Sequence, residues 1–303
     1  VAAVIALGIS MFVAIYASYQ NLYISYDYTY STLVMGDYFI TVDYVPERAI
    51  REMNDIPGVQ AQGQVVGNVK LDLDTGGGER VEARIVSLPS NHRPLVGDVK
   101  LEGGSYFSPG DKREVLLPPA FAQYHDLERG DSLTIERGTL KTTFTVAGVA
   151  IHPEYLWVAK SAQELVSTAK TFGVIFMPEQ RAEELFEMEG MVNQIGVAFD
   201  DGVDEEEAVD RIKEILNHYG IKRFTSKDDV GSISARKIDI VQGARSAYMV
   251  PRADQTSYNI LKADLDGLQQ MSFLFPILFL GVAALAIYIL LGRLVESQRV
   301  QIG

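Results

Sequence analysis

Residues 271–292 constrain this chain most, because they form an uncharged apolar run that reads MSFLFPILFLGVAALAIYILLG. As a helix rising about 1.5 Å per residue the run would extend over roughly 33 Å, close to the ~30 Å hydrocarbon core of a bilayer. Pro276 lies in its first turns, where a missing N–H costs least. We therefore expect a membrane-spanning helix over residues 269–292. Small residues give this helix a face suited to close contacts (Gly281, Ala283, Ala284 and Ala286).

The N-terminal residues 1–26 form a second uncharged apolar segment. Tyrosines gather toward its far end, as in the aromatic belt at a membrane interface (Tyr16, Tyr19, Tyr23 and Tyr26). A secretory signal peptide is the alternative, but the segment lacks a basic start and a clear cleavage site and is too long. We expect residues 1–26 to span the membrane. Because Val1 begins inside an apolar helix, we also expect the chain to be a fragment of a longer protein.

The distribution of charge predicts the orientation of the two spans. The chain carries a formal net charge of -13, yet Arg293 and Arg299 follow directly on the C-terminal apolar run. Positive residues collect on the cytoplasmic side of a span, so residues 293–303 are predicted to be cytoplasmic. Two crossings then place residues 27–268 outside the cytoplasm in a multi-pass protein of the cell membrane. An acidic body of this kind is repelled by phosphate backbones, which argues against nucleic-acid binding.

The sequence offers no set of residues that predicts catalysis, a cofactor or a metal site. Cysteine is absent, which excludes a thiol nucleophile and a thiolate zinc site, and no P-loop motif occurs. Asp72 and Asp74 begin like a calcium loop, but Ala83 occupies the twelfth position, where a glutamate belongs. The histidines are scattered without the spacing of metal ligands (His92, His125, His152 and His218). We therefore expect no catalytic, cofactor-binding or metal-binding residue.

Residues 27–268 carry the patterns of an α+β domain. Residues 37–72 and 193–225 each show a strand, a helix and a strand, and look like distant copies of one βαβ unit that pack in one layer. A strand-rich stretch lies between them. We expect it to form a small, closed or nearly closed β-rich subdomain, inserted over about residues 80–180. The predicted architecture is thus a βαβ-repeat subdomain with a β-rich insertion, flanked by two transmembrane α-helices.

Shorter segments complete this prediction. Short helices are expected to begin at Pro118 and Pro178, because proline suits the first turn of a helix. Residues 226–258 lack a clear period, which favours a loop with one short irregular element. A helix is expected to start near Tyr258 and to run toward the membrane.

Three stretches of sequence carry a family resemblance: LERGDSLTI, FTVAGVAIHPEY and the C-terminal ESQRVQIG. With one span before and one after the large domain, the chain resembles the FtsX-like, MacB-type permeases of ABC transporters over nearly its whole length. The C-terminal stretch is the most specific, since it is similar to the family's E/Q-R-x-x-I-G junction just past the second span. The matching residues are Glu296, Gln298, Arg299, Ile302 and Gly303.

The resemblance implies a membrane permease subunit that binds no nucleotide and is not itself an enzyme. A separate ABC ATPase subunit would hydrolyse ATP, and the five junction residues would lie near that ATPase. Such permeases act as homodimers or heterodimers in the lipid bilayer, and they export drugs or peptides, handle lipoproteins or activate cell-wall hydrolases. The resemblance also implies further spans after Gly303.

Two further interpretations stay open at this stage. Tyr155, Leu156 and Trp157 could form an apolar tip of the outside domain that contacts a substrate or partner; a place in the core is the alternative. The layout of two spans around an outside domain is also that of a receptor kinase or chemoreceptor sensor. After the permease and the sensor, a membrane-anchored enzyme is the third class of function, and no set of catalytic residues supports it.

Overall fold

The computed structural model describes residues 2–73, 80–110, 113–158, 169–226 and 245–302. The chain divides into two compact units, which are described separately. The first comprises residues 1–29 and 260–303, and the second comprises residues 30–259.

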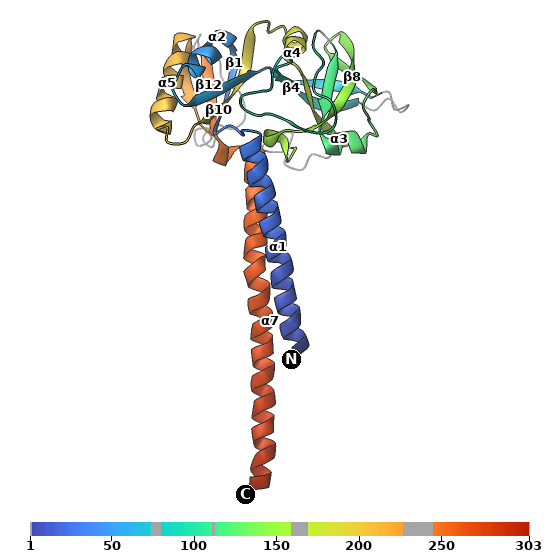
Figure 1. Ribbon diagram of the computed structural model, residues 1–303, viewed down its shortest axis with the longest axis vertical. Coiled ribbons are helices and arrows are strands. Elements are labelled where there is room, and N and C mark those ends of the chain that lie inside the picture. The colour runs from blue at the N-terminus through green and yellow to red at the C-terminus, as the bar shows by residue number, and fades with distance from the viewer. Residues whose placement is uncertain (1, 74–79, 111–112, 159–168, 227–244, 303) are drawn as a thin grey trace. The chain divides into compact units, whose positions relative to one another are not determined.

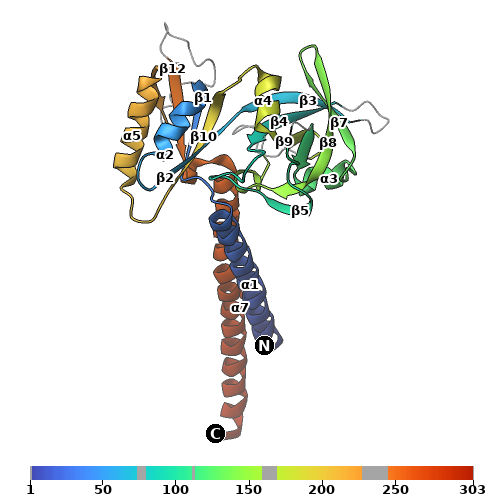
Figure 2. The same cartoon turned by 45° about the horizontal axis from the view of Figure 1, so that its top comes forward.

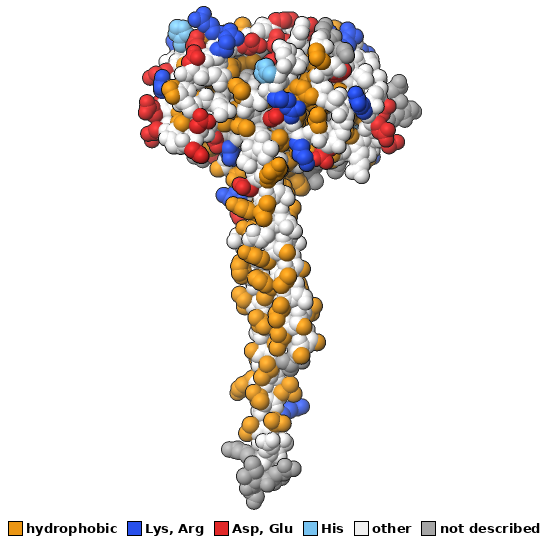
Figure 3. All heavy atoms as spheres, viewed as in Figure 1, with side chains coloured by type: hydrophobic (Ala, Val, Ile, Leu, Met, Phe, Trp, Pro, Cys, Tyr) orange, Lys and Arg blue, Asp and Glu red, His pale blue; other side chains and the backbone are white. Residues whose placement is uncertain are grey.

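The first unit is a pair of long helices, drawn in blue and red in Figure 1. Helix α1 (Ala2–Thr32) and helix α7 (Thr256–Ile302) are both long and apolar enough to cross a membrane. They lie side by side in both ribbon views, and the rings of Phe12 and Phe273 are 6.1 Å apart. A Cβ atom at Gly8 would lie 3.0 Å from the Cβ atom of Phe279, so glycine permits this close approach. Figure 3 shows hydrophobic side chains exposed along the pair, which fits a lipid environment.

Helix α7 begins at Thr256, close to the predicted start near Tyr258. It is a single helix of 47 residues, in which Pro276 lies in the interior although it stands near the start of the apolar run. The helix begins well before the apolar run, so the proline falls about two fifths of the way along it. A proline in a helix interior removes one backbone hydrogen bond, and this loss is confined here to one turn of a continuous helix.

The second unit contains two sheets. The first sheet, sheet A, has five strands in the order β11-β12-β1-β10-β2. Both predicted βαβ repeats contribute to it, as expected. The N-terminal repeat supplies β1, α2 and β2, and the C-terminal repeat supplies β10, α5 and β11. The bounds are β1 Tyr38–Pro46, α2 Glu47–Asn54, β2 Val59–Gln64, β10 Met191–Phe199, α5 Glu205–His218, β11 Ile221–Thr225 and β12 Arg245–Pro251.

Helices α2 and α5 cover one face of sheet A, as Figure 2 shows. Helix α5 begins where the side chain of Asp204 accepts hydrogen bonds from the backbone N–H groups of Glu206 and Glu207. It ends at His218, and Gly220 follows in a left-handed conformation (φ 87°). The apolar side chains of both helices meet alternate residues of the strands, and this core includes Ile40, Met53, Ala61, Ile195, Ile212, Leu216 and Met249.

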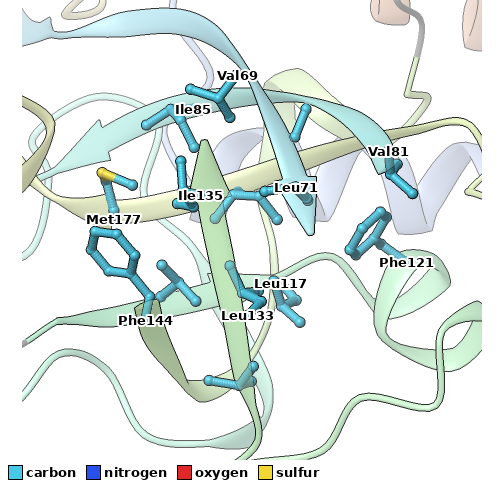
Figure 4. Close-up of a cluster of buried hydrophobic side chains, with 14 of the residues drawn as sticks. Val69, Leu71, Val81, Ile85, Leu117, Phe121, Leu133, Ile135, Phe144 and Met177 are labelled. Carbon is cyan, nitrogen blue, oxygen red and sulfur yellow. The ribbon is translucent and has the colours of Figure 1, made fainter. Parts of the chain in front are cut away.

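The second sheet, sheet B, has the order β5-β8-β6-β9-β4-β3-β7, and β7 also pairs with β8. This extra pairing closes every strand except β5 into a barrel, so the expected closed β-rich subdomain is confirmed. The bounds are β3 Val66–Asp72, β4 Arg80–Leu88, β5 Lys100–Gly104, β6 Glu114–Leu117, α3 Pro119–Tyr124, β7 Ser132–Arg137, β8 Leu140–Ile151, η1 Pro153–Tyr155, β9 Phe172–Pro178 and α4 Glu179–Phe186. Alternate side chains of the strands fill the interior, as Figure 4 shows for Leu71, Ile85, Leu133, Ile135 and Phe144.

The predicted secondary structure is wrong for two segments and is confirmed for two short helices. Residues 59–72 were expected to form one strand, but the chain leaves sheet A after Gln64 and enters sheet B at Val66, so the barrel begins earlier than residue 80. Residues 245–251 were expected to be irregular, yet they form β12 between β11 and β1. Helices α3 and α4 follow Pro118 and Pro178, as predicted.

Candidate functional site: a cavity between the sheets

The face of sheet A that α2 and α5 leave uncovered forms one wall of a cavity. Because side chains alternate along a strand, Ile40 points to the helices while Phe39 and Thr41 point the other way. Gln194 on β10 and Tyr248 on β12 lie on this same face by the same alternation. Together these side chains line a cavity of about 300 Å³.

The opposite wall comes from the barrel. Strand β8 ends at Ile151, and the chain turns into the short helix η1, where the Nδ1 atom of His152 accepts a hydrogen bond from the backbone N–H of Glu154. This turn brings Glu154 and Trp157 to the cavity, where Arg84 of β4 joins them.

The third wall is the start of α7. The side chain of Gln255 donates to the backbone carbonyl of Glu154 at 3.0 Å. The hydroxyl oxygen of Ser257 accepts a hydrogen bond from the backbone N–H of Trp157, also at 3.0 Å. These bonds hold the first turn of α7 directly against η1, so the cavity joins sheet A, the barrel and the root of α7.

Glu154 lines the cavity, and its carboxyl group is strongly perturbed. Gln194 donates its side-chain N–H groups to both carboxylate oxygens of Glu154, at 3.1 and 3.2 Å. Burial nevertheless raises the pKa of Glu154 to about 7, although the Gln194 hydrogen bond and the charge of Arg84 oppose this shift. The carboxyl group can therefore both donate and accept hydrogen bonds near neutral pH.

The neighbours of Glu154 are shifted by burial as well. Burial lowers the pKa of His152 to about 3, so this histidine is neutral, and its ring stacks on Phe176 at 5.3 Å. Burial also raises the pKa of Tyr155 above its ordinary value. His152 and Tyr155 are thus both uncharged near neutral pH.

Residues 155–157 divide between the two interpretations that the sequence left open. Tyr155 is only 9% exposed and packs in the core outside the barrel wall, so the core alternative holds for this residue and the contact tip is wrong for it. Its ring faces Phe176 because η1 folds back onto β9. Leu156 is half-buried, while Trp157 is 40% exposed and lines the cavity. Trp157 therefore keeps the accessible surface that a contact residue needs.

The five junction residues lie at the far end of α7. Glu296 and Gln298 are exposed on this helix. The side chains of Arg299 and Ile302 and the whole of Gly303 lie outside the described residues. Their contact with an ATPase stays a prediction.

Sequence reasoning missed Glu154, Arg84 and Gln194 as a group. Gln194 carried a signal, since it is a polar residue inside the apolar strand β10, but Glu154 and Arg84 resemble ordinary surface charges. As for metals, no group of three or more histidine, aspartate or glutamate side chains that could hold an ion occurs within the described part of the chain.

Comparisons with known proteins identify the family. The model of the MacB-like periplasmic core domain matches residues 1–215. Two similar solved structures both have a TM-score of 0.43. The extracellular domain of the noncanonic ABC-type transporter YknZ from Gram-positive bacteria has 13% identity, with 67% of this chain and 89% of that chain covered. The periplasmic region of MacB from Actinobacillus actinomycetemcomitans has 10% identity, with 76% and 92% covered. The comparison with curated proteins gives no match.

The family match covers the first helix, all of β1 to β10 and most of α5. Together with two helices able to cross a membrane, it indicates a membrane protein with an extracytoplasmic segment. The chain belongs to the MacB-like periplasmic core domain family of ABC transporter permeases.

Proposed function

We propose that this chain is a permease subunit that couples ATP hydrolysis by a separate ATPase subunit to motion of its extracytoplasmic domain. The observation that carries this proposal is helix α7, which runs without a break from the cavity wall at Thr256 to Ile302. At about 1.5 Å per residue it is roughly 70 Å long, more than twice the thickness of a hydrocarbon core. Its far end bears the junction residues, where the ATPase would bind.

The root of α7 is fixed to the extracytoplasmic domain by several contacts. The side chain of Gln255 donates to the backbone carbonyl of Glu154 at 3.0 Å, and the backbone N–H of Trp157 donates to the hydroxyl oxygen of Ser257 at 3.0 Å. Just before α7, Arg252 pairs with Asp37 at 2.7 Å. A displacement of α7 along or about its axis would therefore strain η1 and sheet A together.

The chemistry of transport would lie in the partner. We propose that this chain itself is not an enzyme, and that nucleotide is bound and hydrolysed by the ATPase subunit. The chain would act as one half of a homodimer or heterodimer of permeases.

A helix-breaking variant tests the proposal. Lys262, Ala263 and Asp264 are exposed residues of α7 that precede the apolar run. Changing all three to glycine should destabilise the helix locally by about 3 kcal/mol relative to alanine. The matched control, Lys262→Ala with Asp264→Ala, removes the same charges and keeps the helix.

The protein would be co-purified with the ATPase encoded beside it. Hydrogen exchange of residues 153–158 and 252–258 would be measured with ATP and with a nonhydrolysable analogue. We expect an ATP-dependent difference in the wild type and the alanine control, and its loss in the glycine variant. The proposal fails if no ATPase co-purifies, or if the glycine variant keeps the full difference.

A further inference from the structure

The cavity between the sheets has the size and lining of a small-molecule site. Its volume of about 300 Å³ is at the lower end of the range for ligand pockets. It combines apolar ring faces with convergent polar groups, as such pockets do.

The charges at the cavity favour neither a cation nor an anion. Arg84 lines one wall and would repel a cation. Glu154 and Asp254 line the others and would repel an anion. Glu154 is held partly protonated near neutral pH by burial, which raises its pKa to about 7, so the net charge of the lining is small. A neutral ligand fits this balance best.

The hydrogen-bonding groups are of mixed kind. Glu154 accepts from Gln194 and retains further acceptor capacity on both oxygens. Thr41 and Thr256 contribute hydroxyl groups, which both donate and accept. The hydroxyl of Ser257 accepts from the backbone of Trp157 and can donate its own proton. A ligand with several hydroxyl or amide groups would find a partner for each in this set.

Aromatic faces supply the apolar part of the lining. Phe39, Trp157 and Tyr248 all line the cavity, and Trp157 is 40% exposed. A flat indole at the mouth of a pocket favours a ligand with a planar or ring-shaped apolar face. Hydroxyl groups around such a face are the features of a sugar ring.

We propose that the cavity formed by Phe39, Thr41, Glu154, Trp157, Gln194 and Tyr248 binds a neutral sugar ring, with one face of the ring stacked on Trp157. Gln194 and Glu154 would hydrogen-bond to its hydroxyl groups. This inference does not depend on coupling to an ATPase, since it concerns only the second unit.

The single tryptophan of the chain provides a direct assay. The full chain would be purified in a polyoxyethylene detergent, whose headgroup carries neither a sugar nor a charge. Trp157 emission would be titrated with N-acetylglucosamine, with glucuronate as a charged sugar and with phenethylammonium as an aromatic cation. We expect saturable quenching by N-acetylglucosamine with a Kd of about 1 mM, and binding of glucuronate weaker by at least about tenfold.

Two variants locate the site by calorimetry. Trp157→Ala and Glu154→Leu should each weaken N-acetylglucosamine binding by about tenfold, through loss of ring stacking and of a hydrogen-bond acceptor. Tyr124→Ala is the matched control, because Tyr124 is an exposed aromatic residue on α3 outside the cavity. If Glu154→Leu does not fold, the exposed Trp157 variant decides alone.

Three results would overturn the proposal. One is an absence of saturation with both sugars. Another is saturation by phenethylammonium without sugar binding, which would assign the cavity to organic cations. The last is sugar binding that Trp157→Ala leaves unchanged, since the sugar would then bind elsewhere on the chain.

Discussion

The amide side chain of Asn193 makes the sharpest test of how the two sheets are held together. Its Oδ1 atom accepts a hydrogen bond from the backbone N–H of Val66 at 2.7 Å, and its Nδ2 atom donates to the backbone carbonyl of Val66 at 2.8 Å. Asn193 belongs to β10 of sheet A, and Val66 begins β3 of the barrel. This one side chain thus imitates a strand pairing between the two subdomains.

We predict that Asn193→Ala lowers the free energy of unfolding by about 2–4 kcal/mol. The substitution leaves a half-buried N–H and a half-buried carbonyl unpaired, and each unpaired group costs about 1–3 kcal/mol, less where water can reach it. For a domain of this size the loss corresponds to a fall in Tm of roughly 5–10 °C.

Thermal and urea denaturation of the full chain, followed by Trp157 fluorescence, would measure the effect. Hydrogen exchange of residues 64–68 should rise in parallel, because the Val66 amide loses its acceptor. Asn68→Ala is the control, since Asn68 is exposed on the same strand as Val66, and it should change stability by less than about 0.5 kcal/mol. A loss in Asn193→Ala no larger than in this control would refute the reasoning.

Two further predictions concern pH and packing. Since folding favours the protonated form of Glu154, whose pKa rises from 4.5 to about 7, the contribution of this residue to the free energy of unfolding should fall by up to about 3 kcal/mol as the pH rises from 4.5 to 7. Glu154→Gln should remove this component from urea titrations at several pH values, and a wild-type slope in the variant would contradict it; His152 acts oppositely but equally in both proteins. Gly67→Ala would place a Cβ atom 2.1 Å from the ring of Phe186, whereas Gly103→Ala meets open space. Thermal denaturation should therefore show a loss of about 1–3 kcal/mol for the first variant alone, and equal stabilities would show that Phe186 moves aside freely.

The sequence predicted those parts of the fold that depend on local patterns. Helix α5 was readable because its buried residues recur at helical spacing and Asp204 caps its start. The two apolar helices were readable from length and charge alone. Strand β12 was not, because only Ala247 and Met249 are buried in it, and alanine is a weak strand former. Its place between β11 and β1 comes from tertiary pairing.

The cavity could not be predicted because its residues are distant in sequence. Glu154 meets Gln194 across 40 residues and Gln255 across 101. No local period encodes such a meeting. The predicted apolar tip nevertheless pointed to the right turn of the chain, since Trp157 lines this cavity.

The passage from β2 to β3 has a mechanical consequence. Val65 alone separates Gln64, the last residue of one sheet, from Val66, the first residue of the other. Its backbone N–H and carbonyl are both bonded to Ser87, at 2.8 and 3.0 Å. A one-residue connection whose N–H and carbonyl are both hydrogen-bonded has little freedom to act as a hinge. A force delivered to one sheet at this joint would therefore reach the other sheet directly, through Val65 and its two bonds to Ser87.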